Sequence, residues 1–278
     1  MHLWQSALER LEDYQIRKGL IPLLWCVAKL LLLYVFVNDA MRSIWYLNST
    51  TDPITNGHNL GIMVYTVLCF AGSLLALIPK CTLLGSFLLM VNLMAQSLYH
   101  LVTEASLSPG YEAASILGCI LMIFSAEMQR RFENSQKKTG PILCDGLGFG
   151  IPGLYSRQGM LALAQFLARV GFCVINVGHA YVNYVRKGSL IMVFFNAVIS
   201  IPVLVGFHTR LFAILMATVM WIGFYVNYFT LLDDDRVFLQ EYVWFKFAQT
   251  TSITGGLLML ALQGPGSYSV DAARNKDD

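Results

Sequence analysis

Four ionisable side chains lie inside long apolar runs of this sequence, where they could bind an ion or a polar ligand. Lys29 and Arg169 each come early in an apolar run, and Asp39 and His179 each follow ten residues later. Burying an ionisable group in a membrane span costs about 2.5–3.5 kcal/mol or more, so each one requires a partner. Ten residues of helix rise about 15 Å, so Lys29 and Asp39 cannot pair within one helix. Each of the four therefore pairs with another helix, extends to the lipid headgroups or lines a binding cavity.

Other polar residues extend this set. Arg42 follows Asp39 by three residues and can pair with it directly. Gln249, Ser252 and Gly256 recur at i, i+3 and i+7, so they share one helix face. That face either admits a neighbouring helix closely, as small-residue interfaces do, or walls a cleft. The candidate binding residues are Asp39, Arg42, Gln165, Arg169, His179, Gln249 and Ser252.

The sequence carries no pattern typical of an active site. The histidines are scattered without an i, i+4 pair, and no metal-ligand spacing or nucleophile–base pair is present. The glycine-rich stretch GLGFGIPG (146–153) follows no strand, which argues against a nucleotide fingerprint. We expect the six cysteines to be small buried apolar side chains. The prediction is a protein without catalytic residues, cofactor or metal, and not an enzyme.

Composition indicates the class of protein. Hydrophobic residues make up 56% of the chain and charged residues 13%, with a mean hydropathy of +0.58. Soluble domains carry about 25% charged residues. The net charge of +2 is not clustered, so nothing indicates a nucleic-acid partner. We expect an all-α polytopic membrane protein, surrounded by membrane lipids.

The apolar runs predict about eight transmembrane helices. They fall near residues 21–46, 60–78, 82–103, 112–128, 159–185, 190–206, 211–230 and 246–263. Residues 1–20 precede them with apolar positions at helical spacing and charged residues between, which is typical of an amphipathic helix on the membrane surface.

The distribution of positive charge predicts the orientation. An even number of spans places both termini on one side, and most of the 19 Lys and Arg residues fall in segments on that side. Cytoplasmic loops carry an excess of Lys and Arg, so both termini and the loop 129–158 are expected in the cytosol. Asn48 heads a glycosylation sequon with Ser49 and Thr50, in the first loop on the other side.

The two halves of the chain show an internal repeat. The segment SILGCILMI (115–123) aligns with SITGGLLML (252–260), and the first span aligns with the fifth at an offset of 140. This alignment pairs Lys29 with Arg169 and Asp39 with His179. It predicts two parallel four-helix halves, 21–128 and 159–263, related by an axis along the membrane normal. Residues 264–278 are then a cytosolic tail.

Several segments resemble one protein family. FVNDAMR (36–42), QFLARV (165–170), GFHTRL (206–211), YVNYF (225–229) and FAQTTSITGGLLMLALQGPG (247–266) are similar to the corresponding segments of the Surfeit locus protein 4 family. The chain departs from that family's pattern at three places: Asn38 replaces the Glu of a Glu-Asp pair, residues 113–114 replace an Arg-Asn pair, and Lys246 replaces an Asp. The resemblance therefore indicates a divergent member.

The resemblance implies a cargo receptor that cycles between the endoplasmic reticulum and the Golgi, through the intermediate compartment. Its partners would be soluble secretory proteins, recognised in the lumen through short N-terminal peptides, and vesicle coat proteins such as COPII and COPI. Family members end in a lysine-rich retrieval signal, and Arg274 with Lys276 resembles a weakened form of it. Asp39 is the expected contact for a cargo α-ammonium.

Two other functions remain open at this point. A small-solute or proton-coupled transporter would use the same buried charges, and a parallel repeat suits one. The resemblance also implies a distant relation to bacterial four-span membrane proteins, some of them quinone-linked, although the chain shows no residues for redox chemistry.

Overall fold

The computed structural model describes residues 16–49, 57–104, 108–139, 157–187, 190–229, 237–264, 266 and 268–277, with the backbone alone at several helix ends. Within these ranges the chain forms helices and no strand. The helices are α2 (Ile16–Ser49), α3 (Gly57–Leu77), α4 (Thr82–Glu104), α5 (Ser108–Thr139), α6 (Arg157–Lys187), α7 (Leu190–Val205), α8 (Thr209–Tyr228), α9 (Val237–Gln263) and α10 (Val270–Asp277).

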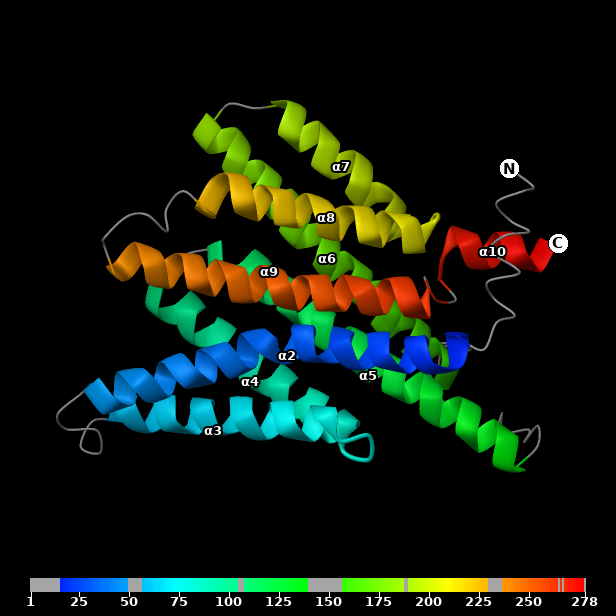
Figure 1. The fold of residues 1–278 in the computed structure, drawn as a ribbon, viewed down its shortest axis with the longest axis horizontal. Helices are drawn as coiled ribbons and strands as arrows, with labels where there is room; N and C mark the ends of the chain where they lie inside the picture. Colours follow the sequence, from blue (N-terminus) through cyan, green and yellow to red (C-terminus); the bar gives the residue numbers. More distant parts are fainter. Residues whose placement is uncertain are drawn as a thin grey trace.

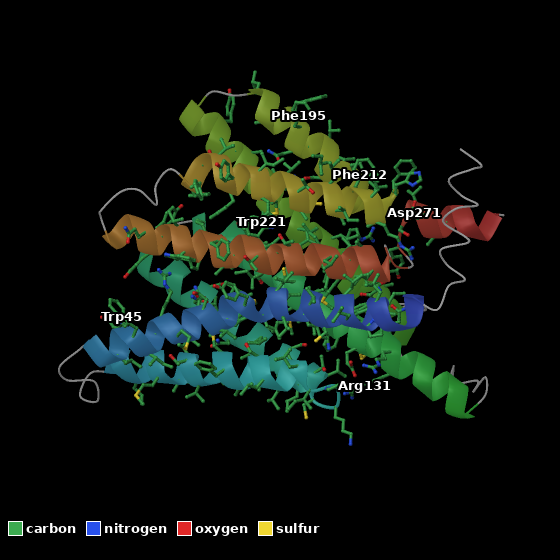
Figure 2. The ribbon with its side chains drawn as sticks, viewed as in Figure 1. Trp45, Arg131, Phe195, Phe212, Trp221 and Asp271 are labelled. Atoms are coloured by element: carbon green, nitrogen blue, oxygen red, sulfur yellow. The ribbon has the colours of Figure 1, made fainter. Side chains whose placement is uncertain are left out.

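The helices confirm an all-α polytopic membrane protein. Each predicted span falls in one helix, from α2 to α9 in order. Five helices, α2, α3, α5, α6 and α8, are long and apolar enough to cross a membrane, and α4 and α7 carry shorter apolar segments. Large apolar side chains cover the outer faces; Phe195 of α7, labelled in Figure 2, is 57% exposed. Such faces are typical of contact with lipid.

Helix α9 lies between other helices, which explains its polar composition. It packs against α2, α8 and α5 (Figure 1), and most of its length from residue 246 to residue 260 is buried. Its Gln, Thr and Ser residues therefore face protein, where polar groups find partners that lipid cannot supply.

Two boundaries differ from the sequence-based expectation. The loop predicted at 129–158 begins as helix, because α5 continues to Thr139 through residues that favour helix and include no Gly or Pro. The tail predicted at 264–278 contains a helix. Gly264, at φ 88°, ends α9 with a left-handed cap, and the chain then forms α10.

The helix contacts repeat between the two halves. Exchanging α2 with α6, α3 with α7, α4 with α8 and α5 with α9 converts each strong contact into another observed one. The α5–α6 contact becomes α9–α2, and the α5–α9 contact becomes itself. This is the pattern that a two-fold axis beside α5 and α9 would give, and it agrees with the repeat seen in the sequence.

The repeat extends to single residues at the two crossings between the halves. A Cβ on Gly118 of α5 would lie 2.9 Å from the Ala168 carbonyl of α6. A Cβ on Gly255 of α9 would lie 2.6 Å from the Ala28 carbonyl of α2. Gly118 aligns with Gly255, and Ala28 with Ala168, in the repeat. Both crossings therefore bring backbone against backbone at equivalent positions.

The α10 end of the molecule, as we call it, is where α2 begins, α9 ends and α10 lies (Figure 1). The opposite end is where α2 ends and α9 begins. The contacts of α9 with α2 place Ser252 against Leu32 and Glu241 against Arg42, so the two helices are antiparallel.

We expect Gly255→Ala to destabilise the protein, because the added methyl group meets backbone atoms that cannot move independently. Overpacking of this kind costs about 1–3 kcal/mol. Gly223→Ala is the matched control, since nothing lies within 4 Å of a Cβ there. The thermal midpoint in detergent should fall for Gly255→Ala and stay level or rise for Gly223→Ala. Equal thermal midpoints for the two variants would contradict the close approach of α9 to α2 at Gly255.

Candidate functional site

A polar cluster lies where α2, α3 and α4 meet, towards the opposite end. The Tyr65 hydroxyl of α3 lies 3.3 Å from Asp39 Oδ2 and 3.4 Å from Gln96 Oε1. A hydroxyl carries one hydrogen, so it satisfies only one of these oxygens at a time. Asn38 precedes Asp39, and its buried Nδ2 has no hydrogen-bond partner among the described residues. The cluster therefore holds more hydrogen-bonding capacity than its own members use.

The cation next to Asp39 in sequence points to a different partner. Arg42 Nη2 donates to the Glu241 carbonyl of α9 at 2.6 Å and lies 4.0 Å from the Glu241 carboxylate. In the described part of the chain, no cation comes within ion-pair distance of Asp39, although Arg42 is close enough to attract it. Arg42 thus joins α2 to α9, and the Asp39 carboxylate is left with a hydroxyl as its side-chain partner.

The first turns of the buried part of α9 hold a second polar group. Lys246 Nζ donates to Gln249 Oε1 at 3.3 Å and lies 5.4 Å from the centre of the Tyr242 ring. Gln249 is 2% exposed, and its Nε2 has no hydrogen-bond partner among the described residues. Ser252 is fully buried and donates to the Leu32 carbonyl of α2, so it serves helix packing.

An aromatic cluster surrounds Phe247 of α9. Its ring meets Tyr34 of α2, Trp221 and Phe224 of α8, and Trp244 of α9, with centroid distances of 5.6 to 6.2 Å. Trp221 is labelled in Figure 2, on α8. All four contacts are edge-on, the geometry that aromatic pairs prefer. The cluster supplies an apolar surface on the same helices as Asp39 and Gln249.

The remaining described candidates lie at the α10 end. Arg169 is fully buried; its Nη1 donates to the Leu204 carbonyl at 3.2 Å and its Nη2 to the Tyr268 carbonyl. Gln165, one turn earlier, packs against Gly266 so closely that a Cβ there would overlap its side chain. These two residues hold the segment that joins α9 to α10.

Asp271 secures the same segment from the other side. Its carboxylate accepts hydrogen bonds from the His208 amide at 3.0 Å and the Thr209 amide at 3.2 Å. His208 is the N-cap residue of α8, at φ 42°, and its own side chain makes no capping bond. Asp271 therefore caps α8 from a distant part of the chain; Figure 2 shows it at the start of α10.

The structure thus separates the predicted site residues into two groups. Asp39, Arg42 and Gln249 lie towards the opposite end, and Gln165 and Arg169 lie at the α10 end. The side chains of His179, Asn48, Arg274 and Lys276 lie outside the described residues. Residues 1–15, where an amphipathic helix is predicted, and residues 140–156 lie outside them as well.

Sequence reasoning missed three contributors. Tyr65 joins Asp39, Glu241 holds Arg42, and Asp271 caps α8. Tyr65 lies in an apolar span, where a tyrosine is expected to pack as a large apolar side chain. Nothing in the sequence links it to Asp39. Asp271 lies in a polar tail. The lack of a capping side chain at His208 is the one signal that could have suggested a remote cap.

The described cysteines are free. Among the described residues, no group of three or more His, Cys, Asp or Glu side chains is arranged to hold a metal ion.

We expect Asp271→Ala to loosen the contact between α8 and α10, because two backbone amides lose their acceptor. Loss of a cap costs about 1 kcal/mol. Hydrogen exchange measured by mass spectrometry should speed up at residues 208–209 and in α10. Asp271→Asn keeps one acceptor oxygen and should show a smaller change. Exchange in Asp271→Ala equal to that of the parent would show that Asp271 does not hold these elements together.

Comparison with known proteins gives the family. The model of the SURF4 family matches residues 5–276. An uncharacterized protein of Caenorhabditis elegans is 25% identical over 292 residues, covering 97% of this chain and 98% of the relative. A Surfeit locus protein 4 homolog of Drosophila melanogaster is 29% identical over 82 residues, which cover 29% of this chain and 30% of the relative. No solved structure matches the chain. Since the family match spans nearly the whole sequence, this multi-pass membrane protein belongs to the SURF4 family.

Proposed function

We propose that the chain is a transmembrane cargo receptor, rather than an enzyme, that captures soluble secretory proteins in the lumen of the endoplasmic reticulum. The observation that carries the proposal is the Asp39 carboxylate. It lies within a membrane helix, beside Tyr65 and Gln96, and no ion-pair partner is present for it in the described part of the chain. Membership of the SURF4 family supports the same class of function.

The chemistry of the cluster suits a peptide N-terminus. An α-ammonium group has three hydrogens to donate, and it carries a positive charge that could contact Asp39 directly, as Arg42 does not. The Asp39 carboxylate and the Gln96 amide oxygen share a single Tyr65 hydrogen, so they can accept from such a ligand. A carboxylate in a helix interior is costly without a partner, and a cationic ligand offsets that cost.

The aromatic cluster suits the side chains that follow the N-terminus. Tyr34 precedes Asp39 by five residues on α2, a rise of about 7.5 Å along the helix. An extended peptide advances about 3.3 Å per residue, so the second or third residue of a bound cargo would lie level with Tyr34. Five residues also turn about 140° around α2, so Tyr34 faces α9 while Asp39 faces α3. An apolar side chain that follows the N-terminus would meet the aromatic rings only where the peptide passes around α2 between the two surfaces. Within this proposal, the cargo has a free N-terminus followed by apolar residues.

The orientation follows from the charge distribution. With both termini in the cytosol, as the excess of Lys and Arg on that side predicts, the opposite end faces the lumen. Asp39 and the aromatic cluster then lie on the lumenal side of the bundle. The α10 end faces the cytosol, where Arg274 and Lys276 would act as a retrieval signal for the COPI coat and return the receptor from the Golgi and the intermediate compartment.

Asp39→Asn should reduce the capture of secretory cargo about tenfold or more, because a hydrogen bond between charged groups contributes about 1.5–3 kcal/mol. Co-precipitation of cargo with the full-length protein measures the loss. Asp39→Glu keeps the charge and should restore much of the binding. Capture by Asp39→Asn equal to the parent, with normal protein levels, would refute the role of Asp39. Solute uptake by proteoliposomes without cargo capture would favour a transporter instead.

Replacing Arg274 and Lys276 together by Ala should shift the receptor from the endoplasmic reticulum towards the Golgi, because a coat that reads basic side chains loses its contact. Fluorescence microscopy of the full-length protein in cells measures this shift. Replacing Asn275 by Ala between them is the control. An unchanged distribution of the double variant would mean that retrieval does not depend on this signal.

A further inference from the structure

A cavity of about 640 Å³ lies at the α10 end of the first half, apart from the Asp39 cluster. It is lined by α2, α5, the end of α9 and the turn between α3 and α4, and it opens to the outside. Part of its lining is apolar and comes from Trp25, Leu77 and Leu262; the rest is polar and includes Lys29, Arg130 and Gln263.

The charges around the cavity leave an excess of positive charge. Glu127, the acidic residue of the lining, pairs with Arg131 at 3.0 Å. Arg131, labelled in Figure 2, also donates to the Lys80 carbonyl. Lys29 lies within electrostatic reach of Glu127 and Arg130. Neither Lys29 nor Arg130 makes a hydrogen bond or ion pair with any described residue. An anionic group in the cavity would be attracted by both cations.

The lining also contains an acceptor without a donor. Gln263 Nε2 donates to Gln129 Oε1 at 2.9 Å, but the buried Gln263 Oε1 has no hydrogen-bond partner among the described residues. A buried acceptor left without a hydrogen bond costs about 1–3 kcal/mol. A ligand that fits this cavity therefore carries both negative charge and a hydrogen-bond donor such as a hydroxyl.

The residue equivalent to Lys29 in the second half shows which partners a cation takes at this position. Arg169 aligns with Lys29 in the repeat, and its guanidinium donates to the carbonyls of Leu204 and Tyr268. The chain supplies the second oxygen by turning back after Gly264. In the first half, α5 continues as a helix to Thr139 instead of turning at the position equivalent to Gly264. The chain thus supplies two carbonyl oxygens to the buried cation of the second half, whereas no described residue accepts a hydrogen bond from Lys29.

The surroundings of the cavity indicate which kind of molecule would bring oxygen atoms to Lys29 and Arg130. Exposed apolar side chains flank it on α2 and at the end of α3, among them Leu20, Leu23 and Ile78. These side chains face lipid in a membrane-spanning bundle, and the cavity lies at the helix ends where headgroups are found. A lipid fits both surfaces if its acyl chains lie against the exposed apolar side chains and its charged headgroup enters the cavity.

We propose that this cavity binds the headgroup of an anionic phospholipid, with Lys29 and Arg130 contacting phosphate oxygens and Gln263 accepting from a headgroup hydroxyl. The apolar wall formed by Trp25 and Leu77 receives the start of the acyl chains. The site is independent of the Asp39 cluster and of cargo binding.

Native mass spectrometry of the full-length protein, delipidated in detergent and titrated with dioctanoyl phosphatidylinositol, tests the proposal. The parent should bind one such lipid, and Lys29→Gln combined with Arg130→Gln should weaken binding about tenfold or more. Arg210→Gln, which removes an exposed cation outside the cavity, should leave binding unchanged. Ala126→Leu narrows the cavity without removing charge and should also weaken binding. Thermal midpoints equal to the parent's show that each variant is folded.

Three outcomes would overturn the proposal. The first is equal binding of dioctanoyl phosphatidylcholine, because the site would then not select negative charge. The second is binding of inositol 1-phosphate or inorganic phosphate as tight as that of the lipid, because the source would then be a free phosphate. The third is unchanged lipid binding in both the double charge variant and Ala126→Leu.

Discussion

The close approach of backbones at the two crossings between the halves is the constraint on which the other contacts depend. Hydrocarbon does not drive apolar helices together, so helices in a bilayer associate where small residues let their backbones meet. Gly118 against Ala168 and Gly255 against Ala28 provide this at equivalent places. The α5–α6 and α9–α2 pairs formed in this way close the ring of helices, and they set the register in which every polar side chain meets its partner.

Because of that register, the polar side chains have different kinds of partner at the α10 end and at the opposite end. Arg42 bonds to Glu241 because α9 runs antiparallel to α2 at this spacing, and Asp39 on the same helix meets the Tyr65 hydroxyl of α3 instead. At the α10 end, Arg169 bonds to backbone oxygens that the chain brings to it. The repeat therefore places related cations in both halves, and the described part of the chain supplies carbonyl oxygens to Arg169 but not to Lys29.

Much of the fold could be predicted from the sequence, because the length and position of apolar runs follow from the thickness of a bilayer. The repeat was also visible, since its signature at residues 115–123 and 252–260 is the packing surface of the two crossings. Partners across helices were not predictable. Arg42 stands three residues from Asp39, and only the register of α9 shows that its nearest oxygen belongs to Glu241. Likewise, grouping Arg169 and Gln165 with Asp39 as one site overlooked their depth along the bundle. Helix α10 went unpredicted because its docking depends on the exposed amides at the start of α8.

The position of α9 has a consequence for how the protein is made. Helix α9 has three neighbours, α2, α5 and α8, and all of them leave the ribosome before it does. Several of its hydroxyl and amide groups bond to protein, Ser252 to α2 and Gln249 to Lys246. The ring of contacts between α8 and α2 can therefore close only after α9 is made, so the contacts of α2 are completed by the last part of the second half.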